Sequence, residues 1–320
     1  MTGVVCRGLP GEWLNGWLAA IGLLVLEPRL SLSWTREHSP SAVLTADGED
    51  PLSLAAGAWP PEQRLNAMPI AEHLEGLPDM RRSVSLEVFR SRAELGRRHP
   101  DSWTLSSSVT DLCVDVGTES TVRHAPLDPK GPDTVKWLHH RLTKSHSMVE
   151  QPSNAIPSSL EGHGRRVVDN GLGFDASRIT GPADSAGKLV DPVIEVLAFF
   201  GLRVLPMRGD GVEIGKSGPR PRFAARQRCW HLDTTQSSRG QCMTWPSWSQ
   251  ALDLAGVDAL LDLWSDLIER AGSGHRVLYG DLERLGIHAA WRTRPYQPRG
   301  SGDTTVGFTS ARVELGAPRP

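Results

Sequence analysis

Two long apolar runs stand out in a chain that is otherwise rich in charged residues, glycine and proline. The first is Leu14–Leu26 (LNGWLAAIGLLVL), and the second covers residues 190–206 (VDPVIEVLAFFGLRVLP). Each run is long enough for a helix, and each passes through an Ile-Gly-Leu or Phe-Gly-Leu step. In the first run, apolar residues recur three and four positions apart, which predicts a helix over residues 13–26. Pro28 prevents the helix from continuing.

The second run carries its own start and stop signals. Asp191 is a natural helix N-cap, and Pro192 occupies the first helical position, where its missing N–H costs nothing. These residues predict a helix over residues 193–200, with Gly201 as its C-cap and a strand over residues 202–205. We expect this helix to be among the most buried elements, so Glu195 within it needs a partner or an exposed edge.

Alternation of apolar and polar residues predicts several short strands. Residues 30–35 alternate in this way, and residues 42–45 are expected to pair with them across the turn at Ser39 and Pro40. Residues 222–232 and 241–245 form a second predicted hairpin. Residues 105–116 and 304–315 are further predicted strands.

Helical spacing predicts additional helices over residues 62–77 (interrupted by Pro69), 83–96, 134–148 and 257–271. The predicted fold class is therefore α+β, with short mixed or antiparallel strands packed by a few helices and many loops. Proline, serine and glycine between residues 149 and 169 predict a linker-like segment. It would separate an N-terminal α+β region (1–148) from a C-terminal α+β region (170–320).

The composition adjusts this picture. Of 320 residues, 39% are hydrophobic, which suffices for a core, while 32 glycines and 24 prolines imply many loops. The net charge of −2 excludes a global attraction to nucleic acid, so any basic surface must be local. Four cysteines without a CxxC pair predict scattered buried thiols in a reducing cytoplasm. Neither apolar run reaches the roughly 20 residues that span a bilayer, so no membrane contact is expected.

The densest basic run leads into the first strand of the second predicted hairpin and overlaps it, and Phe223 and Trp230 lie among or beside its cations. Arginine beside aromatic residues suits phosphate contact combined with stacking on unpaired bases. The alternative is a solvated loop that leads into an edge strand, whose charges discourage aggregation. The residues of this predicted nucleic-acid-binding run are Lys216, Arg220, Arg222, Arg226 and Arg228.

A second basic group lies on the predicted helix 134–148. Its cations Lys136, Arg141 and Lys144 predict a face that contacts phosphates, and a solvated helix face is the alternative. Three histidines lie in the same segment, but no thiolate or carboxylate accompanies them at helical spacing, so we predict no metal site. These histidines are His139, His140 and His146.

No catalytic motif is found. Four carboxylates could hold Mg²⁺ in principle, but their spacing does not match a two-metal nuclease, and one of them already caps a helix; they are Asp169, Asp175, Asp184 and Asp191. His163 near Asp169 is a similarly weak pair. The GxSxG, HExxH and Walker-type patterns are absent. We therefore assign no catalytic residue, no metal ligand and no cofactor, and an enzyme is the less expected class of protein.

The second apolar run, the Arg-Gln-Arg-Cys-Trp segment after it and the later TWPSW segment together resemble the C-terminal part of accessory and effector proteins of type I-U (also called I-G) CRISPR systems. The segment LNGWLAAIGLLVL resembles the opening helix of the same group, and the segment DNGLGFDASRI is also similar to sequences of that group. The resemblance covers separate pieces of the chain and rests on apolar and glycine patterns.

This resemblance implies a non-enzymatic subunit or accessory protein of an RNA-guided surveillance complex against invading DNA. Its partners would be CRISPR effector proteins and guide RNA or target DNA. The resemblance assigns no active-site residue to this chain. Its near-neutral net charge differs from the charge expected of a subunit that holds nucleic acid by itself. A protein-interaction scaffold without nucleic-acid contact and a metal-dependent nuclease using Asp169, Asp175 and His163 are the alternatives.

Overall fold

The computed structural model of the protein describes residues 2–71, 73–77, 84–104, 111–114, 121–123, 136–169, 171–172, 189–205, 228–232, 241–272, 279–296 and 307–313. Helices and small antiparallel sheets build this part of the chain, so the fold is α+β, as predicted.

The helices are α1 (Leu14–Leu26), α2 (Pro51–Gly57), α3 (Glu62–Asn66), α4 (Leu86–Arg97), α6 (Lys136–Ser147), α7 (Pro152–Glu161), α8 (Pro192–Gly201), the 3₁₀ helix η1 (Leu202–Val204), α9 (Leu254–Gly272) and α10 (Tyr279–Arg284). The strands are β1 (Thr2–Pro10), β2 (Ser31–Trp34), β3 (Ser41–Ala46), β4 (Val84–Ser85), β5 (Asp111–Val114), β6 (Thr121–Arg123), β7 (Val167–Val168), β8 (Leu189–Val190), β9 (Trp230–Leu232), β10 (Gln241–Trp248), β11 (Ile287–Tyr296) and β12 (Gly307–Arg312).

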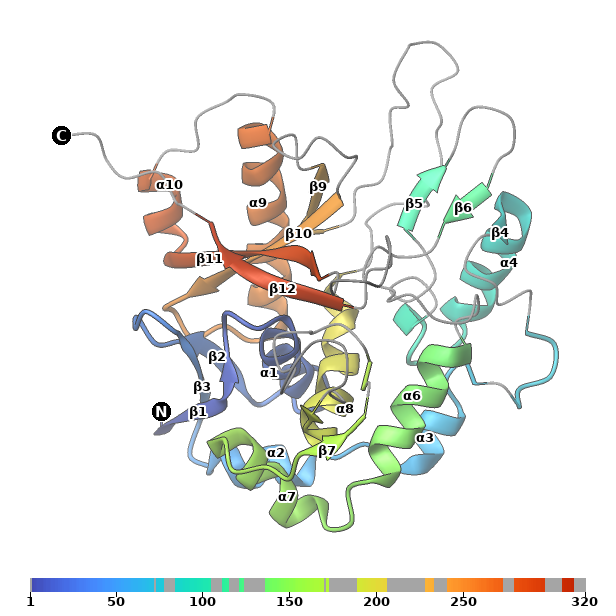
Figure 1. Ribbon diagram of the computed structural model, residues 1–320, viewed down its shortest axis with the longest axis horizontal. Coiled ribbons are helices and arrows are strands. Elements are labelled where there is room, and N and C mark those ends of the chain that lie inside the picture. The colour runs from blue at the N-terminus through green and yellow to red at the C-terminus, as the bar shows by residue number, and fades with distance from the viewer. Residues whose placement is uncertain are drawn as a thin grey trace.

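The two apolar runs form a pair of helices at the centre of the molecule. Figure 1 shows α1 and α8 in the middle, with the β1–β3 sheet on the N-terminal side and α9 with strands β9–β12 above them. Every residue of α8 is buried, as are α1 residues 14–25. A helix that is apolar all round belongs inside a core, and both helices occupy that place.

Glycine lets the backbones of α1 and α8 touch. A Cβ atom on Gly22 would lie 1.9 Å from the carbonyl oxygen of Leu197, and one on Gly201 would lie 2.0 Å from that of Leu18. The contact is reciprocal, because each of these leucines precedes the glycine of its own helix by four residues. Both helices carry the same pattern, Leu-Ala-x-x-Gly-Leu, starting at Leu18 and at Leu197. The contact therefore has a local two-fold symmetry.

This packing corrects the predicted C-cap and the predicted strand after it. Gly201 has φ of −63°, which is helical, and the chain continues into the 3₁₀ helix η1 instead of a strand over residues 202–205. The glycine is required for the close approach of Leu18 and not for a left-handed turn, so it does not end the helix. The N-cap prediction is confirmed, since the Asp191 carboxylate accepts a hydrogen bond from Val193 N–H at 3.0 Å.

The buried carboxylate of Glu195 has partners, as its predicted position required. Its side chain is almost fully buried in α8, where Asn15 Nδ2 of α1 donates to Oε1 at 2.6 Å and Leu172 N–H donates to Oε2 at 2.7 Å. Charge-assisted hydrogen bonds of this kind offset the cost of removing a carboxylate from water. The pair Asn15–Glu195 thus adds a polar contact to the apolar α1–α8 interface.

The N-terminal sheet has the order β1–β3–β2, and all its pairings are antiparallel. The pairing of β2 with β3 across the turn at residues 35–40 confirms the first predicted hairpin. The edge strand β1 was not predicted, because Gly3, Gly8 and Pro10 interrupt its apolar alternation.

The C-terminal sheet has the order β12–β11–β10–β9. Pairing of β9 with β10 confirms the second predicted hairpin over its described part, and β12 confirms the last predicted strand. The long strand β11 was not predicted. Trp245 and Trp248 of β10 are fully buried, and their indole N–H groups donate to Gly11 O at 2.8 Å and Leu32 O at 2.9 Å. These tryptophans are core residues that join the two sheets.

One hydrophobic cluster includes residues from both predicted regions of the chain. The segment predicted to be a linker contains α7, whose Ile156 and Leu160 are buried and which packs on α2 and β1. Part of that segment is therefore a packed helix. The predicted helix 62–77 is shorter than expected and is confined to α3, whereas α4, α6 and α9 match their predicted positions.

Two of the predicted buried thiols are confirmed. Cys6 and Cys229 are buried and free, and burial raises the pKa of each thiol to about 12. Within the described ranges, no helix combines the length and apolar character needed to cross a bilayer.

The glycine contact generates a stability prediction. We expect Gly22→Ala and Gly201→Ala each to lower the free energy of unfolding by about 3 kcal/mol, because the new methyl group would overlap a backbone carbonyl that cannot move aside. The control is Gly57→Ala at the end of α2, where a Cβ meets nothing within 4 Å. Urea unfolding followed by tryptophan fluorescence measures all three, and equal stability of Gly22→Ala and the wild type would contradict the prediction.

Candidate nucleic-acid interface

The structure divides the predicted basic run into two parts. Lys216, Arg220, Arg222 and Arg226 lie outside the described residues, and their assignment stays a prediction. Arg228 is described, and its side chain is only 9% exposed.

Arg228 is held inside the protein by hydrogen bonds from its guanidinium group. Nε donates to Asp262 Oδ1 at 2.8 Å, while Nη1 donates to Asp258 Oδ1 at 2.5 Å and to Val204 O at 3.0 Å. The side chain thereby connects the chain two residues before β9 to α9 and to η1. Because both carboxylates neutralise it and protein atoms cover it, Arg228 acts as a structural anchor, and we leave it out of the interface.

The basic helix α6 is also engaged with its neighbours. Lys144 forms an ion pair with Asp169, and Arg141 Nη1 donates to Leu172 O at 3.2 Å. The side chain of Lys136 is outside the described set. Two of the histidines have structural contacts as well: His139 Nε2 donates to Leu65 O, and His146 stacks on Trp59. The cations of this helix that the structure places are therefore directed toward segment 169–172.

A basic cluster that the sequence did not indicate lies where the two sheets meet. It consists of Arg36 and His38 in the β2–β3 turn, His288 at the start of β11 and Arg312 at the end of β12; we call it the Arg36–Arg312 cluster. Arg312 Nη1 donates to His38 Nδ1 at 3.1 Å, and its guanidinium lies 5.7 Å from the ring centre of Trp291. Arg36 Nη2 donates to Ser249 Oγ at 3.1 Å.

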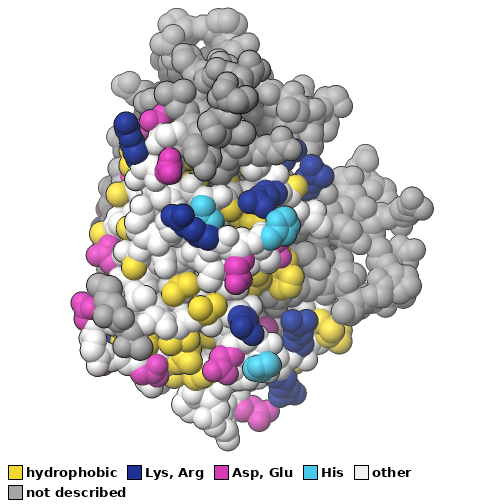
Figure 2. All heavy atoms as spheres, turned by 90° about the vertical axis from the view of Figure 1, so that its left-hand side faces the viewer, with side chains coloured by type: hydrophobic (Ala, Val, Ile, Leu, Met, Phe, Trp, Pro, Cys, Tyr) yellow, Lys and Arg dark blue, Asp and Glu magenta, His cyan; other side chains and the backbone are white. Residues whose placement is uncertain are grey.

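The charge of this cluster is not neutralised by ion pairs. Among the residues that the structure describes, neither Arg36 nor Arg312 forms one, whereas the exposed Arg29, Arg98 and Arg165 are each paired with a glutamate. Glu37, exposed in the same turn, offsets one positive charge. Figure 2 shows basic and histidine side chains gathered on the face that looks to the left in Figure 1, with an acidic side chain nearby.

Histidine protonation in the cluster responds to its surroundings. The half-buried ring of His288 donates from Nε2 to Thr35 O at 3.0 Å. Burial lowers the pKa of His288 below its usual value, and the positive charges of Arg36 and Arg312 lower it further. His288 is therefore neutral at pH 7 and orders the β2–β3 turn, while the exposed arginines supply the positive charge.

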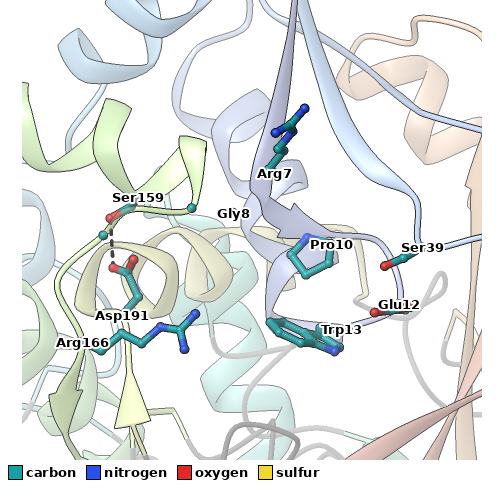
Figure 3. Close-up of a pocket in the computed structure, with 11 residues that line it drawn as sticks. Arg7, Gly8, Pro10, Glu12, Trp13, Ser39, Ser159, Arg166 and Asp191 are labelled. Atoms are coloured by element: carbon teal, nitrogen blue, oxygen red, sulfur yellow. Dashed lines mark hydrogen bonds between the residues drawn. The ribbon is translucent and has the colours of Figure 1, made fainter. Parts of the chain in front are cut away.

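Close to this turn, the surface contains a pocket of about 260 Å³ (Figure 3). Its walls come from β1, the start of α1, the end of α7 and the N-terminus of α8, and Ser39 of the β2–β3 turn completes it. The residues that matter for its chemistry are Arg7, Glu12, Trp13, Ser159, Arg166 and Asp191.

No metal-binding group is apparent in the part of the chain that the structure describes, since no three His, Cys, Asp or Glu side chains gather there. Asp169 accepts hydrogen bonds from Lys144 and from Gly171 N–H, and His163 is exposed on the segment after α7. Asp175 lies outside the described residues. The described geometry thus gives the nuclease alternative no assembled centre.

Arg228 as a structural anchor and Arg228 as a nucleic-acid contact predict different results when the residue is replaced. We expect Arg228→Gln to lower the free energy of unfolding by about 2 kcal/mol, because it leaves Asp258 and Asp262 facing a neutral side chain. Urea unfolding is the measurement, and Arg203→Gln, an exposed arginine of η1, is the control. A wild-type unfolding curve for Arg228→Gln, together with weaker nucleic-acid binding, would return this residue to the interface.

Comparison of the chain with protein-family models finds no match, and comparison with curated protein sequences finds no similar protein.

Proposed function

We propose that this chain is a non-enzymatic subunit or accessory protein of a type I CRISPR surveillance complex that contacts guide RNA or target DNA and other protein subunits. The assignment to this class rests on the sequence resemblance. The contact with nucleic acid rests on one structural observation, the exposed Arg36–Arg312 cluster.

The position of the resembling segments supports the first part of the proposal. The two apolar runs that carry the resemblance are α1 and α8, which pack against each other through Gly22 and Gly201. The TWPSW segment lies in β10, where Trp245 and Trp248 join the sheets. The resemblance therefore concerns residues that determine the architecture, and a shared architecture is what related subunits would have in common.

The Arg36–Arg312 cluster supports the second part. Guanidinium groups without carboxylate partners bind phosphate oxygens through paired N–H donors. Arg312 also lies over Trp291, which fixes the orientation of the guanidinium plane. A local cluster on a chain of net charge −2 would add to the phosphate contacts of partner subunits, so the near-neutral total charge is compatible with this role.

A scaffold without nucleic-acid contact is the second candidate. The observation in its favour is that Arg228 and Lys144, two of the predicted binding residues, are paired with carboxylates of the same chain. The two candidates differ in whether bound RNA or DNA is required for the assembly.

The first experiment is purification of the tagged full chain from its native host, followed by proteomics and sequencing of bound nucleic acid. We expect CRISPR effector proteins and guide RNA to be recovered together. A protein complex that survives nuclease treatment and contains no guide RNA would favour the scaffold. Recovery of neither effector proteins nor guide RNA, from cells that express the system, would contradict the proposal.

A second experiment tests the cluster itself. We expect the double variant Arg36→Gln/Arg312→Gln to bind single-stranded RNA more weakly and to reduce the slope of log affinity against log salt by about 1.4, since two phosphate contacts are lost. Its matched control is Arg29→Gln/Arg98→Gln, which removes the same charge from arginines already paired with glutamates. Fluorescence anisotropy at several salt concentrations measures both.

The four residues of the predicted basic run that lie outside the described part of the chain need a variant of their own. Neutralising Lys216, Arg220, Arg222 and Arg226 together, with Arg228 left intact, should flatten the salt dependence further. Unchanged binding would remove these four residues from the interface. Equal effects of Arg36→Gln/Arg312→Gln and Arg29→Gln/Arg98→Gln would remove the Arg36–Arg312 cluster.

A further inference from the structure

The pocket beside the β2–β3 turn is formed by close backbone contacts. A Cβ on Gly8 of β1 would lie 1.8 Å from Ser159 O, and one on Gly164 would lie 1.9 Å from Asp191 Oδ2. Gly162 adopts a φ of +94°, a conformation suited to glycine, and it ends α7 at this place. The three glycines hold β1, α7 and α8 together, so the walls of the pocket are preformed.

The polar side chains of the pocket differ in burial, with the cations exposed and a carboxylate and a hydroxyl buried. Asp191 and Ser159 are buried and bonded to each other, with Ser159 Oγ donating to Asp191 Oδ1 at 3.1 Å (Figure 3). Arg7 and Arg166 are exposed at the rim, and within the described part of the chain neither forms an ion pair. The neighbouring Arg165 differs, since it is paired with Glu150 and does not line the pocket.

An aromatic side chain completes the site. Trp13, the half-buried residue that precedes α1, lines the pocket next to Glu12. In Figure 3, Arg166 extends past Asp191 with its guanidinium directed toward the Trp13 side, while Arg7 stands at the opposite rim and points outward. The site therefore combines an indole ring, carboxylates on its walls and two cations at its edge.

We propose that this pocket binds one nucleotide, either free or as an unpaired unit of a nucleic-acid strand. The strand form rests on the proposed function above. A volume of about 260 Å³ lies slightly below the usual range for drug-sized ligands and suits a single small polar molecule. Indole faces stack on nucleobases, and unpaired arginines bind phosphate, so the two requirements of a nucleotide are met in one pocket.

The charges determine the orientation of the ligand. Asp191 and Glu12 repel a phosphate, which therefore lies at the rim with Arg166, while the base enters beside Trp13. Carboxylate oxygens accept hydrogen bonds from the exocyclic amino groups of adenine, cytosine and guanine. Uracil offers its ring N3–H to the same acceptors, so the carboxylates alone do not distinguish uridine nucleotides from the others.

The pocket and the Arg36–Arg312 cluster are neighbours on the surface. Ser39 lines the pocket and directly follows His38 of the cluster in the β2–β3 turn. A strand whose phosphates contact Arg36 and Arg312 can therefore place its next unpaired nucleotide in the pocket. Arg7, directed outward, is then available to the phosphate on the far side.

The test uses the full chain and four probes: adenosine, cytidine and uridine 5′-monophosphates, and a short single-stranded RNA. Calorimetry measures binding to the wild type and to Arg166→Gln, with Arg165→Gln as the control of equal charge. We expect the three monophosphates to bind and Arg166→Gln to weaken their binding about tenfold, as the loss of one charge-assisted hydrogen bond implies. Arg165→Gln should bind as the wild type does.

The possible results separate this inference from the proposed function. Mononucleotide binding that depends on Arg166, without RNA binding, would support a site for a free nucleotide and count against the nucleic-acid role. RNA binding that is weakened by Arg36→Gln/Arg312→Gln but is the same in Arg166→Gln and Arg165→Gln, without mononucleotide binding, would overturn the pocket and leave the proposed function standing. Equal loss of binding in Arg166→Gln and Arg165→Gln would also overturn the pocket.

Discussion

The backbone contact between α1 and α8 is the constraint on which the rest of the structure depends. Two helices approach this closely only where a residue lacks a Cβ, and here Gly22 and Gly201 meet the opposing carbonyl groups of Leu197 and Leu18. From this pair, α1 carries Trp17 to β10 and Asn15 to Glu195, while α8 places Asp191 against Ser159. The two glycines determine how far apart α1 and α8 lie. These helices in turn position the sheets, the buried Glu195 carboxylate and one wall of the pocket.

Much of the fold could be predicted because its signals are local. The N-cap at Asp191 and the alternation in β2 and β3 each involve residues within a few positions of one another. The role of Gly201 could not be obtained this way, since glycine after an apolar helix usually marks a left-handed cap, and only the facing carbonyl of Leu18 reveals a packing contact. The strand β1 was missed for a related reason: Gly8 interrupts its apolar alternation because the backbone of α7 at Ser159 lies against it.

The candidate site was harder to predict because charge density along the sequence is a poor guide to charge in space. Lys144 and Arg228 lie in the most basic segments, yet Asp169, Asp258 and Asp262 neutralise them in the fold. Arg36 and Arg312 lie in segments with no excess of basic residues and meet only when the two sheets associate. Unpaired arginines are defined by the absence of a nearby carboxylate in three dimensions, which no spacing in a single sequence encodes.

The link between His38 and Arg312 has a consequence for the timing of assembly. The β2–β3 turn supplies one side of the Arg36–Arg312 cluster, and β12 supplies the other, with His38 and Arg312 lying 274 positions apart in the sequence. An incomplete nascent chain carries Arg36 and His38 but not the strand that completes the cluster. The complete charge pattern therefore first exists after β12 has been synthesised and has paired with β11, so it reports that both sheets are in place.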